Sequence, residues 1–389
     1  MSESHDRIIR VESNIASINP EAWDACANPD QATYNPFISH AFLSALEDSG
    51  SVSPRAGWSP QHLVLEDDAG NIEGVMPYYL KSHSRGEYIF DHGWADAYEQ
   101  AGGAYYPKLL SVVPFTPVNG RRLLVPPSED FEHREQLLLS GALELCNRTE
   151  TSSIHLNFLT EPEWKRLGDY GFLQRTDQQF HWHNQGFDCF AQFLETLTSR
   201  KRKTIRKERR EVDTHNISIR WITGSDLTEK HWDTFFGFYI DTGARKWGSP
   251  YLNREFFSLL GERMADRILL VVCQRNERII AGALNLIGGD TLYGRYWGCV
   301  EDHKFLHFEA CYYQAMDYAI ANGLKHVEAG AQGPHKLARG YTPRTIYSAH
   351  YIADPRFRAA VADFLKHERS YSDMEAEALA GLSPYRKAR

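Results

Sequence analysis

Residues 267–288 read RILLVVCQRNERIIAGALNLIG, an apolar run, a short polar turn and a second apolar run. Residues 61–80, QHLVLEDDAGNIEGVMPYYL, follow the same order, and Gly74 in this segment corresponds to Gly282 in the later one. Apolar runs rich in Val, Ile, Leu and Tyr on either side of a polar turn are typical of β-hairpins. The repetition predicts that the chain folds as two copies of one α/β unit.

An aromatic segment follows each predicted hairpin, EYIFDHGW at 87–94 and TLYGRYWG at 291–298. We expect each segment to be the next strand of its unit. A chain of 389 residues is longer than a single hydrophobic core usually supports and suits two domains. The boundary is placed near HWHNQGFDCF, which predicts a first unit over 1–184 and a second unit over 185–389.

The composition is that of a globular protein, with 42% hydrophobic and 24% charged residues. No run of 18 apolar residues and no leader pattern is present, so we expect no stable membrane insertion and a cytoplasmic location. Six cysteines without a CxxC pair predict reduced, packed thiols and no metal site.

The net charge is −8, yet residues 200–210 hold eight Lys or Arg and one Glu. This segment contributes +7, so the rest of the chain carries −15. Such a balance excludes a protein whose whole surface binds nucleic acid, and it leaves room for a local anion site on an acidic body.

The basic residues are predicted to lie on a long helix over about 189–213, with Asp188 as its N-cap. On a helical wheel Lys201 falls in the apolar seam, together with Glu208, and the other seven basic residues fan across the opposite half. Like charges four residues apart, such as Arg202 and Arg206, repel each other unless an anion binds them. A phosphate-binding face is therefore one interpretation, and a solvated surface helix is the other.

A second predicted helix runs from His303 to Gly323, a plausible C′ glycine. Glu309 falls inside its apolar arc, so this carboxylate is either paired structurally or placed for function. A short strand follows and leads into AQGPHKLARGY at 331–341. Glycines that let backbone amides approach a ligand, with cations beside them, suit a phosphate or an oxyanion. An ordinary irregular loop is the alternative, and the segment is not a P-loop because no GK[ST] follows the glycines.

Two units of hairpin, aromatic strand, helix and strand resemble the GNAT acyltransferase fold in tandem, with mixed, mostly antiparallel sheets flanked by helices. Four longer motifs narrow the resemblance to the FemAB-like family of predicted N-acyltransferases, over nearly the whole chain. These are FDHGWADAY, YYPKLLSVVPFTPVNGRRLL, GARKWGSPYL and HFEACYYQAMDYAIANGLKHVEAGAQGPHKLARGY. The family is often labelled peptidoglycan biosynthesis or recognition.

Related Fem transferases move an amino acid from tRNA onto an amine of a cell-wall precursor. In them a helix that begins the second unit carries a Lys/Arg-rich motif, which SRKRKTIRKERR resembles, and this likeness implies donor binding by Lys201, Arg202 and Arg206. The long helical hairpin of several Fem proteins has no obvious counterpart here, which puts recognition of a whole tRNA in doubt. No glycine lies between Gly298 and Gly323, so CoA bound as in ordinary GNAT enzymes is disfavoured in the second unit.

The leading hypothesis is direct transfer of an acyl or aminoacyl group from a phosphate-containing donor to a small-molecule or peptide amine, without a covalent enzyme intermediate. Aminoacyl-tRNA or acyl-CoA would be a co-substrate, and no cofactor would be bound permanently. Glu309 is predicted to accept the amine proton, Lys336 and Arg339 to bind the oxyanion or donor phosphate, and Tyr296 or Tyr341 to protonate the leaving oxygen. The residues predicted to bind the donor phosphate are Lys201, Arg202, Arg206 and His335. Those predicted to line the substrate cleft are Trp247 and Trp297. The alternatives are a CoA-dependent N-acyltransferase and a non-enzymatic RNA or phosphate-binding protein.

Overall fold

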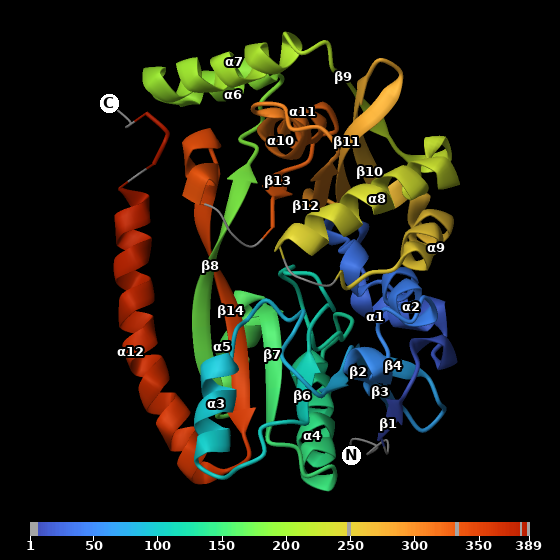
Figure 1. Cartoon of the computed structure of the whole chain (residues 1–389). Helices are drawn as coiled ribbons and strands as arrows, with labels where there is room; N and C mark the ends of the chain where they lie inside the picture. Colours follow the sequence, from blue (N-terminus) through green and yellow to red (C-terminus); the bar gives the residue numbers. More distant parts are fainter. Residues whose placement is uncertain (1–6, 247–249, 331–333, 382, 387–389) are drawn as a thin grey trace. The chain divides into compact units, whose positions relative to one another are not determined.

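The computed structural model describes residues 7–246, 250–330, 334–381 and 383–386 (Figure 1). The chain divides into two compact units. The first comprises residues 1–31, 37–177 and 345–374, and the second comprises 32–36, 178–344 and 375–389. Each is a mixed α/β unit with helices packed on its sheet, as the sequence predicted.

The first unit has a three-stranded antiparallel sheet in the order β1-β3-β4 and a second sheet in the order β2-β5-β6-β7-β14. Its strands are β1 (Ile8–Glu12), β2 (Trp58–Pro60), β3 (His62–Glu66), β4 (Ile72–Met76), β5 (Tyr79–Lys81), β6 (Lys108–Ser111) and β7 (Ser153–Leu159). Its helices are α1 (Pro20–Ala27), α2 (His40–Asp48), α3 (His92–Gln100), α4 (Phe131–Arg148) and α5 (Glu161–Asp169). Strands β8 (Leu173–His183) and β14 (Thr342–Ile352) and helix α12 (Pro355–Ala380) are each divided between the units.

The second unit has the strand order β8-β13-β12-β11-β10-β9. Its strands are β9 (Ser218–Ile222), β10 (Ile268–Arg275), β11 (Arg278–Ile287), β12 (Thr291–Cys299) and β13 (His326–Glu328). Its helices are α6 (Phe190–Thr196), α7 (Ser199–Asp213), α8 (Glu229–Lys246), α9 (Arg254–Met264), α10 (Leu306–Phe308), a π-helical turn (Glu309–Tyr313) and α11 (Gln314–Ala321), with a 3₁₀ segment at Pro334–Arg339. A buried core joins the sheet to α6, α7 and α11.

Both predicted hairpins are present. β3 pairs antiparallel with β4, and β10 pairs antiparallel with β11. Gly74 and Gly282 occupy corresponding places, because an added Cβ would meet Leu138 at 3.2 Å in the first unit and Phe235 at 3.1 Å in the second. Each glycine thus lets a helix side chain rest on its hairpin.

The aromatic strand predicted at 87–94 is wrong. Residues 84–91 form a loop in which Gly86 and Tyr88 have positive φ angles of 82° and 60°, and α3 starts at His92. The strand next to β5 is β6, which pairs antiparallel with β5 and parallel with β7. A residue with left-handed backbone angles cannot continue a strand, so this aromatic segment forms a loop and does not join the sheet.

The prediction of a single long basic helix is also wrong, because the helix is interrupted between α6 and α7. Leu197 and Thr198 are extended, with ψ near 150°. The Thr198 N–H donates to the Pro384 carbonyl, and the Arg386 N–H donates to the Thr196 carbonyl, both at 2.9 Å. Backbone pairing with the far end of the chain therefore replaces helix bonds at this point. Asp188 is not the N-cap, since Cys189 holds that position.

The division into units also departs from a single cut after residue 184. The later part of β14 pairs antiparallel with β7, for example His350 with His155, and Val361 and Leu365 of α12 pack in the core of the first unit. The predicted helix after His303 is present as three short pieces, and Gly323 has the positive φ of a C′ glycine, 67°. Among the described residues no helix combines the length and apolarity needed to cross a bilayer.

Candidate active site

Two parallel strands of the second unit, β12 and β13, separate from each other after a short paired stretch. β12 and β13 pair over three residues, ending at Tyr293 opposite Glu328. The next part of β12 is irregular, because Leu284 of β11 faces Tyr296 whereas Asn285 faces Gly294. Arg295 is therefore an extra, bulged residue beside the point of separation. Bulges of this kind re-aim side chains and end strand pairing next to active sites.

A cavity of about 90 Å³ lies at this separation. Its lining combines parts of β11 and β12 with α10, the π-helical turn and the residue after β13, and it consists of Ala283, Leu284, Asn285, Gly294, Arg295, Tyr296, Trp297, His307, Cys311, Tyr312 and Ala329. Tyr296 and Trp297, both predicted for the site, therefore lie in the cavity wall. Trp247, the other predicted cleft residue, lies outside the described residues.

Positive charge is concentrated beside the cavity. The side chain of Arg295 is 2% exposed, and its Nη2 lies 3.5 Å from Glu328 Oε2. Lys336 is 2% exposed and donates from Nζ to the Gly330 carbonyl at 2.9 Å. Burial, with the nearby Arg295, lowers the pKa of Lys336 to about 8. Burial raises the pKa of Glu328 to about 7, with Arg295 opposing the shift.

His335, predicted as a phosphate ligand, contacts the cavity wall from the 3₁₀ segment. Its Nε2 lies 2.9 Å from the Tyr312 hydroxyl, and burial lowers its pKa. Tyr341 is fully buried, and burial raises the pKa of its hydroxyl well above the ordinary value. The structure therefore places Tyr341 in the core and Tyr296 at the cavity.

Arg339 is held by the inner side of α7. Its Nη2 and Nε donate to Glu208 at 2.7 and 3.1 Å, and its guanidinium lies 3.4 Å from the Phe308 ring centre. Glu208 also accepts a hydrogen bond from the Tyr313 hydroxyl. This buried pair fixes the 3₁₀ segment, which carries Lys336 and His335, to the basic helix.

Glu309 is buried as predicted, and its partner is Arg209 of α7, the residue next to Glu208. Arg209 Nη2 lies 3.0 Å from Glu309 Oε1 and 2.7 Å from Asp317 Oδ2. Gln314 donates to Glu309 Oε1 at 2.8 Å, whereas Oε2 is buried with no hydrogen-bond partner among the described residues. Burial raises the pKa of Glu309, and Arg209 opposes that rise. Glu309 begins the π-helical turn, a feature found often at functional sites.

The outer side of α7 presents cations to solvent. Five are exposed: Arg200, Lys203, Arg206, Lys207 and Arg210. No ion pair joins them to a carboxylate in the part of the chain that the structure describes. Lys201 and Arg202 are half-buried beside them, so the Lys201 side chain is not fully enclosed in the apolar seam. Together these residues form the basic face, a name kept below for the exposed five with Lys201 and Arg202.

Sequence reasoning missed Arg295 and Glu328. Arg295 carries no sequence signal, because a bulge depends on the pairing of two strands. Glu328 is the last residue of the short strand β13, and a carboxylate at the carboxyl end of a parallel strand could have been recognised as a site candidate. Glu208 had a signal as well, since a carboxylate in an apolar seam requires a partner.

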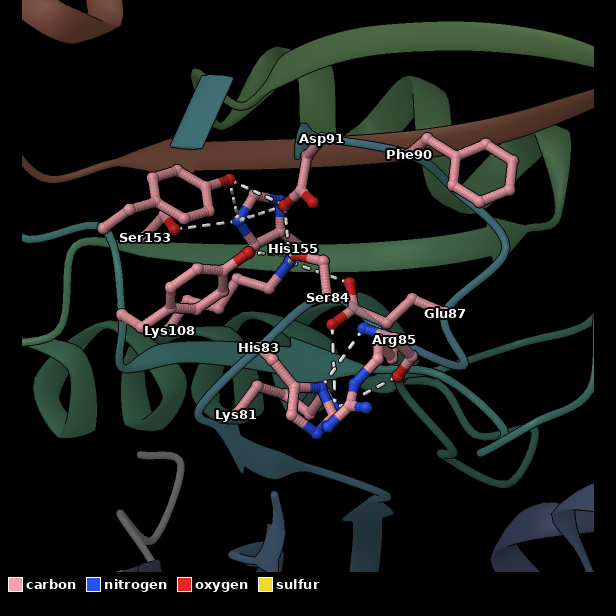
Figure 2. A network of polar contacts seen from close by, with 12 residues as sticks. Lys81, His83, Ser84, Arg85, Glu87, Phe90, Asp91, Lys108, Ser153 and His155 are labelled. Carbon is pink, nitrogen blue, oxygen red and sulfur yellow. Dashed lines mark hydrogen bonds and ion pairs between the residues drawn. The ribbon is translucent and has the colours of Figure 1, made fainter. Parts of the chain in front are cut away.

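The first unit contains a separate buried polar network (Figure 2). Lys108 Nζ donates to Ser84 and Glu87, each at 2.8 Å, and to Asp91. Burial alone would raise the pKa of Asp91 and lower that of Lys108, but Lys108 lowers the pKa of Asp91, and Glu87 and Asp91 together raise that of Lys108. Lys81 lies 3.8 Å from Glu87, and burial lowers its pKa to about 7. One ammonium therefore ties the loop before α3 to the sheet.

The network continues along the sheet through uncharged rings. Tyr105 donates to Asp91 at 2.7 Å, and its hydroxyl lies 3.3 Å from His155. His155 and His350, on neighbouring strands, contact each other through Nδ1 atoms 2.7 Å apart. Burial lowers the pKa of both imidazoles, so both are neutral at pH 7.

Comparison with solved structures identifies proteins of the same fold. FemX superposes with a TM-score of 0.56 at 12% identity, covering 89% of this chain and 98% of that one. L-PGS from Bacillus licheniformis gives a TM-score of 0.51 at 9% identity, covering 86% and 98%. The C-terminal domain of a putative lysylphosphatidylglycerol synthetase from Agrobacterium fabrum gives 0.53 at 8% identity, covering 90% and 97%. At these identities the likeness concerns the fold alone.

Comparison with curated proteins gives no match. A family profile, FemAB-like, described as peptidoglycan biosynthesis/recognition, matches residues 14–387. The match covers almost the full length, in agreement with the motifs quoted from both halves of the sequence. The chain therefore belongs to the FemAB-like family of peptidoglycan biosynthesis or recognition proteins.

Proposed function

We propose that this protein is an aminoacyltransferase or N-acyltransferase that forms an amide between an activated acyl group and an amine. The observation that carries the proposal is the cavity where β12 and β13 part, with Arg295 in its wall and Lys336 buried nearby. Acyl transfer needs positive groups in a water-poor site, because negative charge develops on the carbonyl oxygen. The family supports the same reaction class.

The basic face of α7 is proposed to hold the donor through its phosphates. The five exposed cations have no carboxylate partner among the described residues and repel one another, and bound phosphates would offset that repulsion. The pair of Glu208 and Arg339 joins this helix to the 3₁₀ segment beside the cavity. A donor bound on α7 would therefore be held by the same structural block that carries Lys336.

The residues of α7, of the 3₁₀ segment and of the neighbouring cavity wall have different proposed roles in the reaction. Lys336 binds donor phosphate or the carbonyl oxygen, and Tyr296 returns a proton to the leaving oxygen. Glu309 and Arg339 keep α7 in place through their ion pairs. The amine attacks in its neutral form and the acyl group passes directly to it, so no enzyme nucleophile is required.

Aminoacyl-tRNA is the donor that fits this proposal best. The relatives named FemX and L-PGS share the fold, and a helix with five exposed cations suits a polyanion more than a single pyrophosphate. A peptide or small-molecule amine of a cell-wall precursor is the proposed acceptor, and the cytoplasm is the proposed location.

The test is equilibrium binding of the full chain to mixed aminoacyl-tRNA, uncharged tRNA and acetyl-CoA at two salt concentrations. A Lys201→Ala, Arg206→Ala variant is measured in parallel, with Lys325→Ala as an exposed-lysine control in the same unit. Preference for charged tRNA, a steep fall with salt, and at least tenfold weaker binding by the variant are expected. Tight binding of acetyl-CoA alone, unchanged in the variant, would refute the tRNA donor. Equal affinity for charged and uncharged tRNA would favour a simple RNA-binding protein.

A further inference from the structure

Arg295 occupies a special place in the second unit. It is the bulged residue of β12, at the point where β12 and β13 part, and it lines the cavity. Its Nη1 donates to the Gly294 carbonyl at 2.9 Å, and its guanidinium lies 5.3 Å from the Tyr293 ring centre. The strand irregularity, its own backbone and a neighbouring ring therefore hold a rigid cation at the cavity wall.

A second buried cation lies near Arg295. Arg295 and Lys336 are two buried cations, and Glu328 is the buried carboxylate near Arg295. His181 Nδ1 lies 3.8 Å from Glu328, but burial, with the nearby cations Arg344, Arg295 and Lys336, lowers the pKa of His181 to about 3. The imidazole is thus neutral at pH 7. Two buried cations close together stabilise an anion that enters the region between strands β12 and β13.

We infer that Arg295 is a further catalytic residue, whose guanidinium binds the carbonyl oxygen of the donor as that oxygen becomes negative. The inference rests on the proposed acyl transfer. The nitrogen of the neutral amine forms a bond to the ester carbonyl carbon, and the carbonyl electron pair moves to the oxygen held by Arg295. When the oxyanion collapses, the ester C–O bond breaks, and the proton lost by the amine goes to the leaving ribose oxygen.

Glu328 is the positioning residue of this arrangement. Its carboxylate lies beside Arg295 Nη2 and is fixed at the last paired residue of β13. Removal of the charge would leave the guanidinium in place through its Gly294 bond but free to turn. Glu328 therefore acts through Arg295 and does not touch the reacting atoms.

The test compares Arg295→Met, Arg295→Lys, Arg295→Ala and Glu328→Gln in steady-state transfer of radiolabelled amino acids from mixed aminoacyl-tRNA to a muramyl pentapeptide with a free side-chain amine. For Arg295→Met we expect kcat to fall about 100- to 1000-fold with KM changed less than threefold. Arg295→Lys should keep part of the activity, and Glu328→Gln should fall between wild type and Arg295→Met. Methylguanidine at millimolar concentration should restore activity to Arg295→Ala, which a purely structural arginine would not allow.

Two measurements keep the result interpretable. Arg275→Met removes an arginine that pairs with Glu301 on the surface of the same unit, and it should leave kcat unchanged. The double variant Arg295→Met, Glu328→Gln removes both buried charges and should unfold near the wild-type temperature while staying inactive. An active wild type with Arg295→Met within threefold of it would overturn the role of Arg295 alone. A wild type inactive with this donor and acceptor would overturn the proposed function and this role together.

Discussion

Replacement of Glu208 by Gln tests how firmly the basic helix is attached to the second unit. The Glu208 and Arg339 side chains are only 6% and 9% exposed, and two hydrogen bonds of 2.7 and 3.1 Å join them. Loss of one partner from a buried pair leaves an uncompensated charge, which costs about 3–5 kcal/mol. In a domain of 150–250 residues each kcal/mol lowers Tm by roughly 2–4 °C, so we expect a decrease of roughly 6–20 °C.

Thermal unfolding followed by near-UV circular dichroism measures this change, and hydrogen exchange locates it. Amides of Ser199–Asp213 should exchange faster in Glu208→Gln, whereas the first unit should not change. The matched control is Glu229→Gln, whose pair with Arg254 is exposed on the Glu229 side and should contribute at most about 1 kcal/mol. The double variant Glu208→Gln, Arg339→Met should recover most of the loss. A decrease below 2 °C, or a double variant less stable than the single one, would refute the reasoning.

Three further predictions concern other buried charges. Lys108→Met should speed hydrogen exchange of residues 84–91 at least tenfold, because it removes the anchor of Glu87 and Asp91, and unchanged protection would show that the loop is held otherwise. Burial raises the pKa of Glu163 to about 7 from 4.5, so its contribution to stability is present below pH 4.5 and lost as the pH rises through 7. In urea unfolding, the free energy of unfolding of Glu163→Gln should therefore equal that of wild type at pH 4 and exceed it by about 3 kcal/mol at pH 8. Parallel curves of unfolding free energy against pH would contradict this. Because the pKa of Lys336 is lowered to about 8, donor affinity should weaken as the pH rises from 7 to 9 in wild type and stay constant in Lys336→Arg, and a decline shared by both would assign the titration to another group.

The parts of the fold that depend on local pattern could be predicted from the sequence. The hairpins β3–β4 and β10–β11 follow from two apolar runs around a polar turn, and the C′ glycine at Gly323 follows from the end of an apolar periodicity. The burial of Glu309 followed from its place on a helical wheel. In each case the residues that decide the structure are close in sequence.

The predictions that failed concern features that depend on residues far apart in the chain. The break at Leu197 arises from backbone bonds to residues 384–386, which no helical pattern reveals. The aromatic segment 87–94 has a strand-like composition, but Lys108 anchors its first part as a loop and α3 starts at His92. Arg295 becomes a site residue only because β11 and β12 pair with a bulge. Tertiary pairing overrides local propensity at these points.

The roles of charged residues divide in the same way. Arg339 and Glu309 were predicted as chemical groups, but each has a carboxylate or guanidinium partner on α7, namely Glu208 and Arg209. Those pairs span 131 and 100 residues, so composition alone does not show them. Lys336 is buried near Arg295 of the cavity wall, which is why it keeps its proposed role.

The second unit is proposed to transfer an aminoacyl group to an amine. The most direct measurement incubates the purified chain with mixed aminoacyl-tRNA, labelled in the amino acid, and an amine acceptor from a cell-wall precursor, and identifies products by mass spectrometry. We expect a new amide, whose mass equals acceptor plus amino acid minus water, formed by wild type and at least 100-fold more slowly by Arg295→Met. Release of free amino acid without amide, or amide formation from acetyl-CoA and not from aminoacyl-tRNA, would contradict it.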